Sequence, residues 1–302
     1  MPDGVTADAA ADLRDWKLAL AVTAAAVLAR FVMAGLVPLL PDETYYWEWS
    51  RRPAPSYFDH PPAISAAIAF GTALFGDTRI GVRFGSILLS LVGSLAALAL
   101  ARRLSGGRAA LIAAVALAVM PMAAAGLLLA TPDAPLLAAV AVTLWALLRA
   151  VEEESGNMAE IGWWCVTGLA LGGALLSKYT AVLVPAGAAL GFALDPRLRR
   201  RLLTPGPWVG LGLGLAAFSP VIMWNAGLGW PSFAFQLDHG LGGGSDAGWI
   251  ATAVGALKRV LEYLGGQLGL VSPIIFALMA IAVAFALRRG ARGCLLYTSD
   301  AA

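Results

Sequence analysis

The sequence predicts an all-α, polytopic membrane protein with about eight transmembrane helices. Hydrophobic residues make up 59% of the 302 residues and charged residues only 13%, and the mean hydropathy is +0.76. A soluble domain of this size has too little interior to bury so much apolar surface, so most of that surface must face lipid. Most of the apolar runs also approach the length of about 17 to 25 residues that a helix needs to span a bilayer.

The expected elements begin with an amino-terminal tail over residues 1–15 on the cytoplasmic side. The first apolar run, 16–38, exceeds the roughly 7 to 15 residues of a signal-peptide core, so we expect it to remain as an anchor. The run 62–75 is too short to be an obvious span and is placed as a surface or re-entrant helix. The other expected spans are 80–101, 109–130, 133–150, 162–177, 179–194, 206–224 and 266–287.

The orientation of these spans follows from the basic residues. Three clusters lie between or after spans: Arg102, Arg103 and Arg108; Arg197, Arg199, Arg200 and Arg201; and Arg288, Arg289 and Arg292. If the spans alternate, all three clusters fall on one side, which the positive-inside rule makes cytoplasmic. The membrane domain, residues 16–290, then exposes two large loops outside, at about 39–79 and 225–262. This predicts a multi-pass protein of the cytoplasmic (inner) membrane.

Charge and terminal composition set further limits. The net charge of +2 is too small to indicate a nucleic-acid partner, so none is expected. Residues 291–302 include the sequence GCLLYTSDAA, which differs from the alanine-, leucine- and glycine-rich helices before it. We therefore expect an atypical tail on a chain that is truncated at its carboxyl terminus.

The first outer loop concentrates the polar residues that the rest of the chain lacks. Residues 40–62 read LPDETYYWEWSRRPAPSYFDHPP and combine four carboxylates with six aromatic rings. Asp42 follows Pro41 and is expected to cap a short helix. In that helix Tyr45, Tyr46 and Trp49 fall at spacings that place their rings on one face, which suits a membrane surface.

Several basic residues on the expected outer face go against the positive-inside preference. They are Arg51, Arg52, Arg79 and Arg83, followed later by Lys258 and Arg259. Basic residues in such places often have an anionic partner, such as a lipid head group or a phosphorylated ligand. For the first loop the alternative is pairing with a nearby carboxylate, namely Asp42, Glu43, Glu48 or Asp59.

Short motifs on the expected outer face resemble those of the GT-C glycosyltransferases. They are PDETYYWEWS and YFDHPP in the first loop, ATPDAPLL after the third span, LLSKYTAVLVPAG between the fifth and sixth, and PVIMWNAGLGWPSFAFQLDH near the last outer loop. More narrowly, they are similar to family 39, which contains protein O-mannosyltransferases and the transferases that move aminoarabinose onto lipid A. The resemblance covers residues 16–290.

The resemblance implies a membrane glycosyltransferase with a GT-C-like fold and an extracytoplasmic active face. Its donor would be a sugar linked to a polyprenyl phosphate, and its other partners would be membrane lipids and an acceptor glycolipid, polymer or protein. The alternatives are a secondary transporter and a membrane scaffold. A transporter is expected to carry ionisable groups near the midplane and an inverted repeat, whereas here the charges gather at the span boundaries.

Three carboxylates are candidates for catalysis, because transfer from a polyprenyl phosphate needs a base for the acceptor hydroxyl. Asp42 follows the family's acidic position most closely and is expected to be this base, with its neighbour Glu43 as the alternative. Asp133, in ATPDAPLL, corresponds to a second acidic residue facing the cavity, or else it caps the fourth span.

The departing phosphate also needs a positive environment. Lys178 matches the family's position for a basic contact to donor phosphate, although a lysine between two apolar spans also suits snorkelling to the interface. Arg83 is the second expected phosphate contact. The remaining candidates are Asp59 and His60 as ligands of a divalent cation or of substrate, and Tyr46, Asn225 and His239 as residues of the substrate loops.

Overall fold

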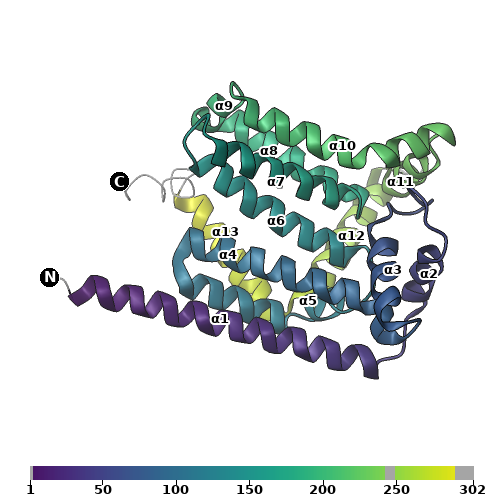
Figure 1. The fold of residues 1–302 in the computed structure, drawn as a ribbon, viewed down its shortest axis with the longest axis horizontal. Coiled ribbons are helices and arrows are strands. Elements are labelled where there is room, and N and C mark those ends of the chain that lie inside the picture. The colour runs from purple at the N-terminus through teal and green to yellow at the C-terminus, as the bar shows by residue number, and fades with distance from the viewer. Residues whose placement is uncertain (1–2, 242–248, 290–302) are drawn as a thin grey trace. The chain divides into compact units, whose positions relative to one another are not determined.

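The computed structural model describes residues 3–241 and 249–289, and every regular element within those two ranges is a helix (Figure 1). The predicted all-α class is therefore confirmed. In chain order the helices are α1 (Asp3–Leu36), α2 (Pro41–Ser50), α3 (Ala63–Phe75), α4 (Arg79–Val119), α5 (Pro121–Gly126), α6 (Asp133–Glu152), α7 (Met158–Leu175), the 3₁₀ helix η1 (Tyr179–Val182), α8 (Leu183–Leu194), α9 (Pro196–Arg201), α10 (Pro205–Gly227), α11 (Pro231–Leu241), α12 (Trp249–Val271) and α13 (Pro273–Arg289).

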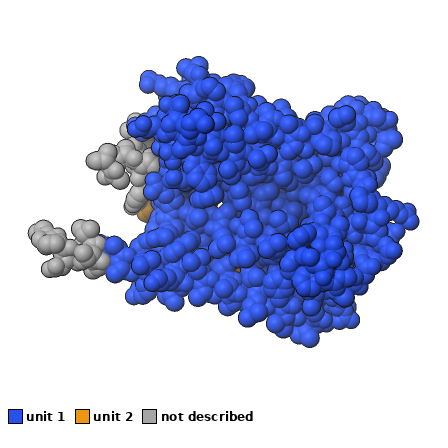
Figure 2. All heavy atoms as spheres, viewed as in Figure 1, with its two compact units in different colours: residues 1–115, 126–242 blue, residues 116–125, 243–302 orange. Residues whose placement is uncertain are grey.

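The chain divides into two compact units, coloured separately in Figure 2. Unit 1 comprises residues 1–115 and 126–242, and unit 2 comprises residues 116–125 and 243–302. All the residues that the sequence nominates for a site lie in unit 1. Helices α12 and α13 belong to unit 2.

Five helices of the described chain are long and apolar enough to cross a membrane by themselves, namely α1, α4, α6, α7 and α10. A sixth span is obtained if the bent pair of α12 and α13 counts as one. The protein is therefore a multi-pass membrane protein, but the predicted number of about eight spans is higher than this count.

Three departures from the expected spans account for the difference. Helix α4 joins the second and third expected spans, although Ser105 and Gly106 have non-helical backbone angles that divide it into 79–104 and 107–119. The sixth expected span is a 3₁₀ turn followed by the short helix α8. The eighth is interrupted at Ser272, which has a φ of 76°, and the helices on its two sides meet at an angle of 112°.

The amino-terminal segment is continuous with the first span. Helix α1 begins at Asp3, within the predicted tail of residues 1–15, and continues without a break to Leu36. Asp12 explains part of this extension, because its carboxylate accepts hydrogen bonds from the Arg102 side chain and from the Gly107 backbone N–H. The start of α1 is thus held against the turn inside α4.

Unit 1 has polar groups at both ends of its helices. At one end, here called the arginine end, Arg102 pairs with Asp12 at 2.8 Å, and Arg103 pairs with Glu152 at 3.0 Å. Arg201 pairs with Glu160 there at 3.2 Å. Figure 1 shows α2, α3 and α11 at the opposite end, far from the N-terminus. We call this the site end.

The helices that run between the two ends pack closely against each other. Helix α7 lies against both α6 and α10, and Gly168 of α7 faces the backbone of Gly210 in α10 so closely that a Cβ atom would overlap it. Small residues at such crossings let helix backbones approach each other, which is how helices commonly associate within a membrane.

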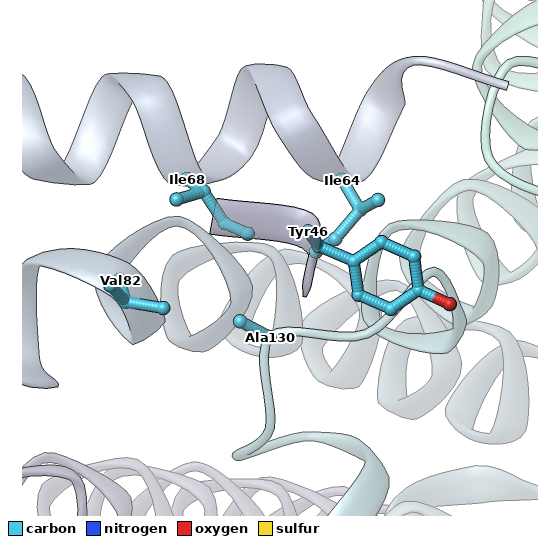
Figure 3. Packing of buried hydrophobic residues seen from close by; sticks show 5 residues of the cluster. All are labelled: Tyr46, Ile64, Ile68, Val82 and Ala130. Carbon is cyan, nitrogen blue, oxygen red and sulfur yellow. The ribbon is translucent and has the colours of Figure 1, made fainter. Parts of the chain in front are cut away.

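A buried cluster supports the segment 39–79, which contains the two helices that the sequence predicts there, α2 and α3. Tyr46 of α2 packs with Ile64 and Ile68 of α3, and Val82 and Ala130 complete the cluster (Figure 3). Tyr46 also contacts Trp49, with ring centroids 5.1 Å apart, so the predicted aromatic face exists. The cluster fixes α2 on the end of the helical bundle.

Candidate active site

Helix α2 is capped by Glu43, not by Asp42. Helix α2 starts with Pro41, whose fixed φ suits the first helical position. The backbone N–H of Leu40, the residue before the helix, donates to Glu43 Oε2 at 3.0 Å. Asp42 lies on the exposed side of the same turn, and no side chain or backbone group of the described residues donates a hydrogen bond to it.

Glu43 forms a fully enclosed ion pair with Arg83 of α4. Both side chains have 0% exposure, with Nη2 2.5 Å from Oε2 and Nε 2.7 Å from Oε1. The backbone N–H of Ala130 donates to Oε1 at 3.0 Å. Burial opposes ionisation of Glu43, but the hydrogen bonds from Arg83, Ala130 and Leu40 outweigh it and hold the pKa of this carboxyl below its ordinary value.

The rest of the Arg83 guanidinium is also occupied. It donates to the backbone carbonyls of Ala34 at 3.2 Å, Val37 at 2.8 Å and Pro38 at 2.9 Å, all at the end of α1. With the two bonds to Glu43, these contacts match the five N–H donors of a guanidinium. Of the two alternatives left open by the sequence, pairing with a loop carboxylate is the one that the geometry realises.

A second ion pair lies at the same end and is partly open to solvent. Lys178 Nζ is 2.8 Å from Asp133 Oδ1, and the side chains are 31% and 45% exposed. Asp133 is the first residue of α6 but makes no capping bond, so the capping alternative is not realised. Lys178 follows the end of α7, which is tied to the first loop because Ala63 N–H donates to the Leu176 carbonyl at 2.9 Å.

Three carboxylates act on the phenol of Tyr46. Burial, together with the negative charges of Asp42, Asp59 and Asp133, raises the pKa of Tyr46 to about 12. Three carboxylates from three separate segments therefore act on one phenol. The structure thus brings Asp42, Asp59 and Asp133 to one side of the molecule, as the sequence predicts.

His60 lies among the same groups. Burial lowers its pKa, and the positive charge of Lys178 lowers it further, while Asp59 and Asp133 act in the opposite direction. Its Nδ1 atom is enclosed, and none of the described residues is a hydrogen-bond partner for it. The imidazole thus has an enclosed nitrogen without a partner among the described residues.

Comparisons with known proteins concern this same part of the chain. A family model described as dolichyl-phosphate-mannose-protein mannosyltransferase matches residues 59–224, which is more than half of the chain. The chain belongs to this mannosyltransferase family.

Two relatives of this family member carry more specific names. The lipid A galacturonosyltransferase RgtD of Rhizobium johnstonii is 27% identical over 243 residues, which cover 80% of this chain and 48% of RgtD. The undecaprenyl phosphate-alpha-4-amino-4-deoxy-L-arabinose arabinosyl transferase of Pseudomonas aeruginosa is 32% identical over 204 residues, which cover 61% of this chain and 37% of that protein. The chain thus spans half or less of the length of these relatives.

Two solved structures agree with the fold. ArnT from Cupriavidus metallidurans bound to undecaprenyl phosphate matches with a TM-score of 0.63 at 26% identity, over 73% of this chain and 44% of ArnT. The S. cerevisiae Pmt1-Pmt2 protein O-mannosyltransferase complex bound to its sugar donor matches with a TM-score of 0.52 at 19% identity, over 74% and 33% of the two chains, which supports the fold alone. The predicted GT-C fold is confirmed.

The donor set of this family member does not suit a divalent cation. Asp59 and His60 are adjacent, and the Asp59 carboxylate accepts a hydrogen bond from the Tyr45 hydroxyl at 2.8 Å. Among the described side chains, no group of three or more His, Cys, Asp or Glu residues converges as metal ligands would.

The second predicted loop contributes two candidate residues, Asn225 and His239. Asn225 is fully buried, and its side chain accepts from Ser232 N–H at 3.1 Å and donates to the Val221 carbonyl at 3.1 Å. These bonds fasten the turn between α10 and α11. His239 lies in α11, beyond the residues whose side chains the structure describes.

Sequence analysis missed the contacts that hold α11 on the first loop. Ser232 Oγ donates to the Tyr57 carbonyl at 3.1 Å, and Gln236 Nε2 donates to the Asp59 carbonyl at 3.0 Å. Phe58 and Phe235 add a ring contact with centroids 5.0 Å apart. The small polar residues within the aromatic stretch PSFAFQ were the available signal. They place α11 beside the backbone of Asp59.

Proposed function

We propose that the protein is a membrane glycosyltransferase that moves a sugar from a polyprenyl-phosphate donor to an acceptor on the extracytoplasmic face. The observation that carries this proposal is the partly open Asp133–Lys178 pair, at the same end of the molecule as Asp42. The match to ArnT bound to undecaprenyl phosphate supports the donor class. The names of the two relatives, which are both sugar transferases, support the reaction class.

The residues have distinct roles in this proposal. Asp42 acts as general base and takes the proton of the acceptor hydroxyl. The acceptor oxygen then forms a bond to the anomeric carbon of the sugar while the bond from that carbon to the phosphate oxygen breaks. Lys178 holds the departing phosphate as its negative charge develops. Asp133 orients the ammonium group of Lys178 through their 2.8 Å contact.

The burial of Glu43 supports Asp42 as the base. All four hydrogen bonds to the Glu43 carboxylate come from protein groups, and its side chain has 0% exposure. An acceptor hydroxyl therefore has no route to it without rearrangement of the loop. Asp42 is exposed and adjacent, so, unlike Glu43, it is open to an approaching substrate.

A transfer assay tests the proposed function. The purified 302-residue chain is reconstituted and incubated with undecaprenyl phosphate carrying aminoarabinose or galacturonic acid, with lipid A as the first acceptor. Mass spectrometry measures both the release of undecaprenyl phosphate and the mass of the modified acceptor. Release with any of these donors supports the proposal, and the Asp42→Asn variant is the negative control. Absence of both donor binding and release would refute it.

Cysteine labelling tests the proposed face. In a chain without Cys165 and Cys294, a cysteine at exposed Ala226 marks the site end, and one at exposed Ser155 marks the arginine end. An impermeant thiol reagent added outside intact cells should label the Ala226→Cys chain and leave the Ser155→Cys chain unlabelled. The opposite pattern would place the site end in the cytoplasm.

A further inference from the structure

We propose that Glu43 and Arg83 are positioning residues that set the location of Asp42 relative to the segment carrying Asp133. This inference rests on the proposed function, because Asp42 and Asp133 are the residues assigned to the transfer. Neither Glu43 nor Arg83 exposes any side-chain surface, so neither is assigned a contact with substrate.

The Glu43 carboxylate joins two parts of the site. Glu43 Oε2 accepts from Leu40 N–H at the start of α2, and Oε1 accepts from Ala130 N–H just before α6. Glu43 is the residue after Asp42, and Ala130 is three residues before Asp133. Three residues of chain span at most about 10 Å. A shift at Glu43 is therefore passed to both catalytic carboxylates over a short length of backbone.

Arg83 anchors the Glu43 carboxylate to helix α4. Its other donors satisfy the carbonyls of Ala34, Val37 and Pro38, where α1 ends and its last carbonyl groups lack helical partners. Arg83 itself lies on the long helix α4. Glu43 is thus held between the ends of two membrane helices.

The Glu43–Arg83 pair does more than stabilise the fold. Apolar residues of similar volume often replace a buried ion pair without loss of stability, so stability does not require this pair. Apolar side chains cannot reproduce directed hydrogen bonds to five backbone groups in three segments, which are contributed by Leu40, Ala130, Ala34, Val37 and Pro38. The pair supplies a defined geometry, and a catalytic site depends on such geometry.

The chain offers a matched control at the arginine end. Glu160 is also a buried carboxylate, with 1% exposure, and it pairs with Arg201 at 3.2 Å. It also accepts from Gly156 N–H at 2.6 Å, as Glu43 accepts from a backbone N–H. Glu160 is at the start of α7, and the sixteen residues from there to Leu176 place it roughly 24 Å from the site end.

The experiment compares Glu43→Gln, Arg83→Lys and Glu160→Gln. We expect Glu43→Gln to reduce kcat by about ten- to a hundredfold, since a displacement of about 1 Å is worth up to a hundredfold. Its donor KM should change less than its kcat, and the acid limb of the pH–rate profile should persist, because Asp42 still acts as base. Arg83→Lys should show the same pattern more weakly, and Glu160→Gln should lower the melting temperature with a parental kcat.

A second readout does not depend on transfer. Hydrogen–deuterium exchange of peptides covering 127–133 should be faster in Glu43→Gln than in the parent, because Ala130 N–H loses its carboxylate, and it should be unchanged in Glu160→Gln. If Glu43→Gln does not fold, Arg83→Lys carries both measurements. Unchanged exchange, equal kcat losses in Glu43→Gln and Glu160→Gln, or loss of the acid limb would each overturn the inference. A parent chain without donor binding or transfer would instead refute the proposed function, while the exchange result still decides the geometry.

Discussion

Two ion pairs at the site end have similar chemistry and opposite surroundings. Glu43–Arg83 is completely enclosed, and the hydrogen-bonding positions of both side chains are filled by protein groups. Asp133–Lys178 is 45% and 31% exposed, and its 2.8 Å contact joins the first residue of α6 to the residue before η1. The enclosed pair holds backbone segments together, whereas the open pair is accessible from solvent.

The difference indicates which charges are able to exchange partners. Lys178 has three N–H donors, and its ammonium can turn to a phosphate oxygen while it keeps or releases Asp133. Arg83 would have to give up five directed bonds before it contacted a ligand. The two basic residues that the sequence nominates for donor phosphate are therefore unequal candidates, and we retain Lys178 for that role.

The largest expected effect is the loss of stability when the enclosed pair is broken. Arg83→Met leaves the Glu43 carboxylate buried without its counter-charge, which should reduce the free energy of unfolding by about 3 to 5 kcal/mol. Lys178→Met breaks the open pair and should change it by about 1 kcal/mol or less, since solvent screens that contact. Denaturant-induced unfolding in detergent measures both values. Equal losses would contradict the contrast between the two pairs.

The next effect concerns activity. Asp42→Asn preserves the size of the exposed side chain but removes the proposed base, so transfer should fall about a hundredfold or more. The free energy of unfolding should stay close to that of the parent. Glu48→Gln is the matched control, because Glu48 lies on the same helix in an exposed pair with Arg52 at 3.5 Å. Parental activity in Asp42→Asn, or an equal loss in Glu48→Gln, would remove Asp42 as the base.

Sequence analysis could predict the common location of Asp42, Asp133 and Lys178, because hydrophobic run lengths and arginine clusters decide which loops share a face. It could not choose the partner of Arg83. That partner is 40 residues away, and four loop carboxylates were available. Only Glu43, at the third position of α2, turns back toward Leu40 and α4. Position along a helix, which composition does not reveal, decided the pairing.

The breaks within apolar runs were also beyond the sequence argument. An apolar run of suitable length predicts a span but does not show where a positive φ will bend it, as happens at Ser272. The prediction that Asn225 belongs to a substrate loop likewise says nothing of what its side chain contacts. In the structure its amide fastens the turn that leads into α11.

A smaller effect separates a specific lysine contact from a general positive charge. Lys178→Ala should weaken the binding of undecaprenyl phosphate by about tenfold or more, since a hydrogen bond to a charged group contributes about 1.5 to 3 kcal/mol. Lys178→Arg should recover only part of this affinity, because a planar guanidinium has a different reach. Equilibrium binding at matched reconstitution measures the three chains. Parental affinity in Lys178→Ala would remove this lysine from the donor site.

The smallest expected effect is a pH dependence that belongs to the open pair. The pKa of His60 is held below the ordinary imidazole value by burial and by Lys178, against the opposing charges of Asp59 and Asp133. The folded protein therefore binds fewer protons at His60 than the unfolded chain does, and stability should fall as the pH drops below about 6.5.

This dependence of stability on pH tests whether the open Asp133–Lys178 pair acts on His60. Thermal unfolding between neutral pH and about pH 5.5 should show a weaker dependence in Lys178→Ala, because one of the two causes that depress the pKa of His60 is removed. His60→Gln should reduce the slope further, since it removes the titrating group. If Lys178→Ala retained the full slope, the charge of Lys178 would not reach His60, and the open pair would be separate from the imidazole.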